Sequence, residues 1–139
     1  MSALSPDMFA HDWLAKTLSI EFPELSPERI VATMPITPAH HQPFGYLHGG
    51  VSVALAETVA SFGGMLNVPP GKVVFGLEIN ANHLRARRDG TLRAIGTPLH
   101  VGQTTQVWDI KIYDDAEKLI CVSRCTLAVV PLQQDKGDA

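Results

Sequence analysis

The stretch HGGVSVALAETVASFGGML, residues 48 to 66, decides how the rest of the chain must fold. Most of its residues favour helix, and its only charged side chain is that of Glu57. Two glycines open it, and Asn67 and two prolines follow it, which predicts a helix over residues 49 to 66. Because a helix that is apolar on almost every side must be buried, the remaining chain is expected to wrap around it.

Alternating apolar and polar residues on both sides of this helix predict strands. One such segment precedes the helix, at residues 29 to 37, and four follow it, at residues 73 to 87, 91 to 101, 105 to 113 and 118 to 130. In the first of the four, Val73, Phe75, Leu77 and Ile79 are expected to share a face.

The junctions between the four later segments carry turn residues, at residues 89–90, 102–103 and 114–115. Such short connections predict a meander of antiparallel hairpins. The fold class is therefore α+β, with a curved antiparallel sheet of about five strands wrapped around one long central helix.

With 139 residues, the chain has room for a single domain. Near its beginning, residues 7 to 18 place apolar side chains at helical spacing, so residues 1 to 27 are expected to form a helical N-terminal segment. Residues 133 to 139 are polar and are expected to form a flexible tail.

The composition argues against several classes of function. The formal net charge is -3, which offers no broad positive field to nucleic acid or to an anionic membrane. No apolar run is long enough to cross a bilayer and the N-terminus lacks a targeting pattern, which predicts a cytoplasmic protein. Cys121 and Cys125 are expected to be buried free thiols, and neither they nor His40, His41 and His100 have the spacing of a metal site.

The predicted helix carries two features that point to chemistry. At its start, His48 precedes Gly49 and Gly50, where backbone N–H groups without a helical partner can hold a developing negative charge. Two turns later, Glu57 brings a carboxylate into an apolar setting, with Ser61 one turn further along the same face. The structural alternative for Glu57 is a carboxylate hydrogen-bonded to a neighbouring strand or subunit.

The distance along the helix predicts an oligomer. Gly49 and Glu57 are separated by about 12 Å of helix axis at about 1.5 Å per residue, so one carbonyl group cannot touch both in one chain. If the two cooperate, the carboxylate must meet the Gly49 amide of another subunit, as two antiparallel helices facing across a two-fold axis would allow. A homodimer with two composite sites is therefore expected.

Three segments resemble the hotdog-fold acyl-CoA thioesterases, and most closely the branch acting on aromatic acyl-CoA esters such as 1,4-dihydroxy-2-naphthoyl-CoA or benzoyl-CoA. They are QPFGYLHGGVSVALAETVASFGG at residues 42 to 64, GLEINANHLRARRDG at residues 76 to 90, and PLHVGQTTQVWDIKIYDDAEKLICVSRCTLAVV at residues 98 to 130. The resemblance implies a hydrolase with no metal and no cofactor, assembled as a homotetramer of two dimers. Its substrate would be an acyl-CoA, or alternatively the ester of an acyl or aryl carrier protein.

The resemblance also implies roles for individual residues. The Gly49 amide would polarise the thioester carbonyl, Gln42 would hold the acyl group, and His48 would lie beside the carbonyl. Glu57 would attack the carbonyl carbon or activate water, and Ser61 would position the carboxylate or the water. Other interpretations remain open: Gln42 could satisfy loop backbone, His48 could only open the helix, and Ser61 could be small packing.

For coenzyme A, the resemblance places His83 and Arg85 beside the nucleotide or the pantetheine arm. Gly50, Arg87 and Arg88 are further candidates, and a solvated hairpin tip is the alternative for these charges. Two other functions stay open as well, a hotdog hydratase or dehydratase and a noncatalytic acyl-binding protein. The set of Gln42, His48, Gly49 and Glu57 favours hydrolysis.

Overall fold

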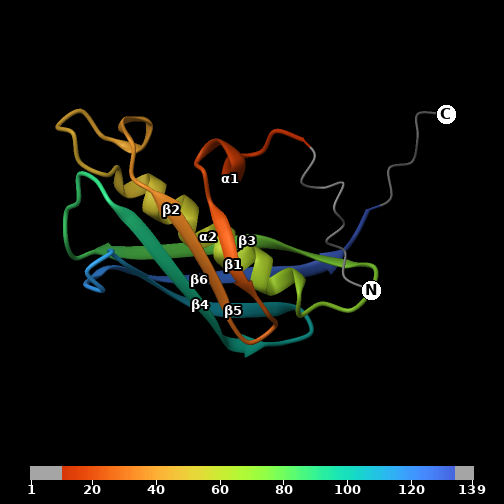
Figure 1. Ribbon diagram of the computed structural model, residues 1–139. Coiled ribbons are helices and arrows are strands. Elements are labelled where there is room, and N and C mark those ends of the chain that lie inside the picture. The colour runs from red at the N-terminus through yellow and green to blue at the C-terminus, as the bar shows by residue number, and fades with distance from the viewer. Residues whose placement is uncertain (1–10, 134–139) are drawn as a thin grey trace.

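A computed structural model describes residues 11 to 133 as a six-stranded antiparallel sheet that curves around one long helix (Figure 1). The elements, in chain order, are α1 (Leu14–Thr17), β1 (Glu21–Leu25), β2 (Ile30–Pro35), a 3-10 turn (Pro38–His40), α2 (Gly49–Met65), β3 (Lys72–His83), β4 (Thr91–Val101), β5 (Thr105–Tyr113) and β6 (Leu119–Pro131). The predicted α+β class and the central helix are confirmed. Within these residues, no helix is long and apolar enough to cross a membrane.

The strand order is β1-β2-β4-β5-β6-β3, which confirms part of the predicted meander and corrects the rest. The hairpins β4–β5 and β5–β6 are as expected. The predicted hairpin at residues 89–90 is wrong, because β3 pairs with β6 and lies at the opposite side of the sheet from β2. The turn at Gly90 instead leads the chain back to the segment after β2. Gly90 has a φ of +89°, and its carbonyl accepts the Ile36 N–H.

The sixth strand, β1, lies at the other edge of the sheet and was not expected from the sequence. It has only five residues, and Pro23 interrupts them with a residue that cannot donate to a strand ladder. An edge position tolerates this proline, so tertiary pairing with β2 prevails over a weak local signal. The expected N-terminal helix is much shorter, at Leu14–Thr17; residues 1 to 10 and the tail at residues 134 to 139 lie outside the described part.

A β-bulge in β3 changes which residues face the helix. The pairing with β6 shifts between Gly76 and Glu78, so Leu77 is an extra residue in the ladder. Before the bulge Val74 points inward, while Phe75 and Leu77 are 64% and 62% exposed. The expectation that Val73, Phe75, Leu77 and Ile79 share one face is therefore wrong, because an alternation of period two cannot continue through an inserted residue.

The core lies between the sheet and one face of α2. Leu55, Ala56 and Val59 are fully buried against the sheet, where Trp108 and Leu127 are buried as well. The opposite face of α2 is only half-buried, and it carries Val53, Ala54, Glu57, Thr58 and Ser61. The sheet of one chain thus covers the helix on one side and leaves a half-buried strip of small and polar side chains open.

Candidate active site

His48 is the N-cap of α2, and its side chain closes the first turn of the helix. Its Nδ1 accepts the Gly50 N–H at 2.8 Å, so the neutral ring carries its proton on Nε2. Two backbone bonds fix the approach to this cap: the His48 N–H donates to the His40 carbonyl, and the Leu47 N–H donates to the Arg87 carbonyl. The solvent-exposed ring therefore presents an N–H donor at the helix start.

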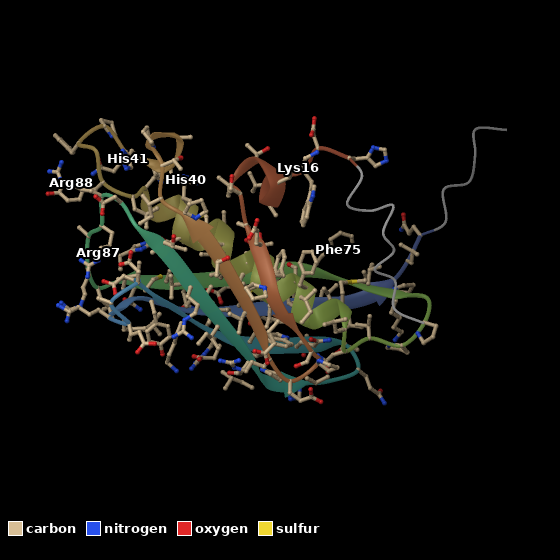
Figure 2. All side chains as sticks on the ribbon, viewed as in Figure 1. Lys16, His40, His41, Phe75, Arg87 and Arg88 are labelled. Atoms are coloured by element: carbon tan, nitrogen blue, oxygen red, sulfur yellow. The ribbon has the colours of Figure 1, made fainter. Side chains whose placement is uncertain are left out.

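His40, which precedes this segment, is 2% exposed and ties it to the N-terminal part of the chain. Its Nδ1 accepts the Thr37 N–H at 3.0 Å, and its Nε2 lies 2.8 Å from the Leu18 carbonyl oxygen. Sequence patterns gave no reason to separate this buried histidine from the neighbouring His41, whose Nε2 lies 2.7 Å from the Arg88 carbonyl oxygen. Figure 2 shows both histidines at the same end of the molecule as Arg87 and Arg88.

The Gln42 side chain shapes the loop before the helix. Its Oε1 accepts the Phe44 N–H at 2.5 Å and the Tyr46 N–H at 3.4 Å. The amide oxygen thus satisfies loop backbone, which was one of the alternatives. Within residues 11 to 133 the amide NH₂ has no hydrogen-bond partner, so it remains able to donate to a ligand.

A cleft of about 420 Å³ lies at the start of α2. Gln42, Gly49, His83, Arg85 and Arg87 are among the residues that line it. The His83 ring lies directly against the helix start, because a Cβ added to Gly49 would come within 2.9 Å of His83 Nε2. The Gly49 N–H itself has no hydrogen-bond partner in the described part of the chain.

The predicted strand over residues 73 to 87 is too long, because β3 ends at His83 and the arginines lie in the following loop. Arg87 is bound to Asp114: its Nε donates to Oδ2 at 2.6 Å and its Nη2 makes a second contact. The Arg88 guanidinium lies 4.1 Å above the centre of the Tyr46 ring. Arg85 is exposed and has no ion pair within the described residues, which leaves its charge available at the cleft.

Asp114 is 5% exposed and is held by several donors. The backbone N–H of Lys118 donates to it at 2.8 Å, and further bonds come from Arg87 and from the Ala116 N–H. The Lys118 bond and the Arg87 charge outweigh the effect of burial and lower the pKa of Asp114 from its ordinary value. Arg87 therefore has a structural role at the edge of the cleft, since its charge is paired with Asp114.

Glu57 lies at a second, separate hollow of about 290 Å³. Trp13, Phe62 and Ser61 are among the residues that line it, and the ring centres of Trp13 and Phe62 are 5.7 Å apart. Glu57 and Ser61 share this hollow, as their spacing predicted. Trp13 and Phe62 were not predicted as part of a site, because an aromatic residue in a helical pattern is first interpreted as core packing.

The Glu57 carboxylate has no hydrogen bond or ion pair within residues 11 to 133. Its Oε1 lies against the backbone of Gly76 in β3, where an added Cβ would overlap it. It also lies close enough to β6 to act on Cys125: burial, with the charges of Glu57 and Glu78, raises the pKa of this thiol to about 12. Cys121 and Cys125 are buried free thiols, as expected.

The cleft and the hollow have no lining residue in common. One chain therefore gathers Gln42, Gly49 and His83 at the helix start and places Glu57 and Ser61 elsewhere on the same helix. Within residues 11 to 133, no group of three or more His, Cys, Asp or Glu side chains is arranged to hold a metal ion.

Comparison with known proteins defines the class. Residues 44 to 121 match the model of the thioesterase superfamily, a range that contains α2 and most of the lining of both cavities. The chain belongs to this family and has its hotdog fold. It is a thioester hydrolase.

Individual relatives cover most of the chain. The 1,4-dihydroxy-2-naphthoyl-CoA hydrolase of Listeria monocytogenes is 51% identical over 116 residues, which are 84% of this chain and 94% of that protein. A thioesterase structure from Haemophilus influenzae superposes with a TM-score of 0.82 at 49% identity, covering 88% of this chain and 85% of that one.

A Staphylococcus aureus relative was crystallised as two variants, one with a glutamate and one with a glutamine replaced by alanine. Their TM-scores are 0.83 and 0.82, with 42% and 41% identity. They cover 85% and 84% of this chain, and each match spans 98% of the other chain. The two replaced positions are separated by the same number of residues as Gln42 and Glu57.

Proposed function

We propose that the protein hydrolyses an aromatic acyl-CoA thioester, such as 1,4-dihydroxy-2-naphthoyl-CoA or a benzoyl-CoA type ester, to the free acid and coenzyme A. The observation that carries this proposal is Glu57: a half-buried carboxylate that has no hydrogen bond or ion pair within residues 11 to 133, in the wall of an apolar hollow with aromatic sides. A carboxylate held in this way lowers the stability of the fold, and a function in the reaction explains why it is present. The aromatic walls favour a flat acyl group, and the Listeria relative acts on such an ester.

The cleft at the start of α2 supplies the electrophilic half of the reaction. The Gly49 N–H, which has no partner among the described residues, donates to the thioester oxygen and stabilises the negative charge that develops there. Loss of one such donor costs about 3 to 4 kcal/mol of transition-state stabilisation in other enzymes. The Gln42 amide is a further donor at the cleft, positioned by the bonds that its oxygen accepts from the loop. The His48 Nε2–H is another donor at the helix start, positioned by the bond from the Gly50 N–H.

The Glu57 carboxylate supplies the attack. In one route its oxygen forms a bond to the carbonyl carbon, the carbon–sulfur bond breaks, and coenzyme A leaves as a thiolate that takes a proton; water then cleaves the resulting anhydride. In the other route Glu57 takes a proton from water, and the water oxygen bonds to the carbonyl carbon; the carbon–sulfur bond then breaks, and the departing thiolate takes the proton from Glu57. Ser61 lies in the same hollow and orients the carboxylate or the water.

A homodimer brings the two halves together. The face of α2 that carries Glu57 is left open by the sheet, and the neighbouring edge strand β3 exposes Phe75 and Leu77. Both features favour a second copy that covers the strip and pairs with the edge. Two helices antiparallel across a two-fold axis then place Glu57 of each chain at the Gly49 amide of the other, and a homotetramer would join two such dimers.

The coenzyme A arm is assigned to the cleft and to the loop after β3. Arg85 has no ion pair within residues 11 to 133 and offers its guanidinium to a phosphate. His83 borders the route to the thioester, Gly50 lies beside it in the first turn of α2, and the exposed Arg88 lies over the Tyr46 ring. Arg87 takes a supporting role here, because its guanidinium is bound to Asp114.

A thiol-release assay with benzoyl-CoA, 1,4-dihydroxy-2-naphthoyl-CoA and straight-chain acyl-CoAs tests the proposal. The aromatic esters are expected to give the higher kcat/KM, and Glu57→Ala is expected to lower kcat by roughly a thousandfold or more while the fold is retained. Glu28→Ala removes an exposed carboxylate from the β1–β2 turn and serves as the control. Undiminished turnover in Glu57→Ala would contradict the mechanism, and a preference for straight chains would contradict the substrate class.

A further inference from the structure

We propose that Gly76 is a positioning residue for Glu57: its missing side chain, together with the bulge at Leu77, leaves the space in which the carboxylate rests. This inference rests on the proposed function, since it explains how the attacking group is held. Gly76 itself contacts no substrate in this proposal.

The contact between the two residues is direct. A Cβ built on Gly76 would overlap Glu57 Oε1 and come within 3.3 Å of the carboxyl carbon. The three heavy atoms nearest to that Cβ position all belong to the Glu57 side chain, so this side chain is what an added methyl group would meet first. Any side chain at residue 76 must therefore move Glu57.

Backbone conformation gives no other reason for glycine at this position. Within residues 11 to 133, the glycines with a positive φ are Gly45, Gly71 and Gly90, and Gly76 is not among them. A glycine inside a strand lowers stability relative to alanine, because it has no side chain to pack and gains more freedom on unfolding. A need for space beside the Glu57 carboxylate explains why a glycine stands here despite this loss of stability.

Other glycines in close contacts face a different environment. Gly96 faces Val59, and Gly63 faces the Trp108 ring, so both allow apolar parts of the core to approach closely. Gly76 instead faces a side chain that has no hydrogen bond or ion pair in the described residues. This contact is thus separate from the packing of the core.

The bulge gives Gly76 its orientation. Val74 and Gly76 both face α2 on one side of Leu77, where Val74 contacts the helix near Gly64. Beyond the bulge the inward positions change parity, so that His83 faces α2 at Gly49. One inserted residue therefore allows the same strand to border Glu57 at Gly76 and the helix start at His83.

Kinetics of Gly76→Ala test the positioning role. The added methyl displaces the carboxylate, and a misplacement of about 1 Å is expected to lower kcat about a hundredfold, with KM changed less than about twofold. In a Glu57→Asp background the side chain is one methylene shorter and clears the methyl, so the further change in kcat is expected to stay below about twofold.

Thermal unfolding of variants at residues 76 and 57 gives a measurement that does not depend on catalysis. Gly76→Ala is expected to raise Tm less in the parent chain than in a Glu57→Ala background, where the overlap is gone. An equal change of Tm in both backgrounds, or an unchanged kcat in Gly76→Ala, would overturn the inference. The two proposals can fail separately. If Glu57→Ala is fully active but the effect of Gly76→Ala on Tm still depends on the Glu57 side chain, the contact between the two residues is supported and the proposed catalytic role of Glu57 is wrong.

Discussion

His48 combines a structural and a chemical task in one ring. Its Nδ1 receives the Gly50 N–H and so satisfies one of the free donors at the helix start. The same bond fixes the tautomer that leaves Nε2–H as a donor at the helix start. Histidine is not among the strongest N-cap residues, so its use here is explained by the second nitrogen.

Two substitutions separate these tasks. His48→Asn keeps a side-chain acceptor for the cap but cannot present the Nε2–H, so stability is expected to stay within about 0.5 kcal/mol of the parent. His48→Ala loses the cap as well and is expected to be less stable by about 1 kcal/mol. Both variants are expected to lose activity by roughly tenfold to a hundredfold.

Urea unfolding and the thiol-release assay measure the two effects side by side. Full activity in His48→Asn would show that the ring serves only as a cap. A stability loss in His48→Asn as large as in His48→Ala would show that the Gly50 bond has no stabilising role.

Individual site residues could be proposed from the sequence because their chemistry is unusual for their position. Glu57 is a lone charge in an apolar helix, and Gly49 and Gly50 open that helix after a histidine. Trp13, Phe62 and Gly76 could not be recognised in this way. Their roles depend on which side chains of other elements lie opposite them, and neither periodicity nor motif spacing contains that information.

At the scale of elements, the loop from β3 to β4 is held by an ion pair between the half-buried Arg87 and the buried Asp114. Arg87 is bound to Asp114, and the carbonyl of Arg87 also accepts the Leu47 N–H next to the N-cap. Asp114 thus connects the β5–β6 turn to the loop that opens the cleft. Removing one partner of such a pair leaves the other buried without compensation.

The pH dependence of stability follows from the sign of the Asp114 shift. Because its folded pKa is lowered from 3.8, the carboxylate stabilises the fold fully above that ordinary value and loses its contribution as pH falls through the folded value. Melting temperatures measured from neutral pH down to about pH 3 are expected to fall at the acid end. Asp114→Asn is expected to melt lower at neutral pH and to show a shallower acid decrease.

Asp115, an exposed carboxylate in the same turn, offers a control. Asp115→Asn is expected to follow the pH profile of the parent protein. An acid decrease that is equally steep in Asp114→Asn and in the parent would assign the pH dependence to other groups.

Elements with long, regular patterns were predictable and those shaped by their neighbours were not. The central helix and the segments that became β4 and β5 follow directly from periodicity. The order of strands did not follow, because alternation says that a segment is a strand and not which strand is its neighbour. The β3 bulge is invisible for the same reason: its evidence is the register against β6.

At the scale of the whole molecule, the separation of the cleft from the hollow makes assembly part of the proposed mechanism. Glu57→Ala removes the carboxylate that attacks the thioester. Gly49→Pro removes the N–H group that binds the thioester oxygen, and proline remains compatible with the first helical position. A mixed dimer then contains one site with both halves intact. Equal random mixing is expected to recover about a quarter of the parent activity.

The measurement is the thiol-release rate after the two inactive variants are co-refolded, with mixed dimers identified by a tag on one chain. Each variant refolded alone is the control. Mixed dimers without activity would contradict shared sites, and activity in a species shown to be monomeric would contradict the need for a partner.

The exposed edge of β3 also matters before any substrate is bound. A newly folded chain presents unpaired backbone groups beside Phe75 and Leu77, and such an edge can pair with any extended segment that it meets. Correct assembly therefore competes with aggregation during biosynthesis, and both depend on how many chains are present at once. For this protein, the yield of refolding should be governed by chain concentration and by how quickly that single edge is covered.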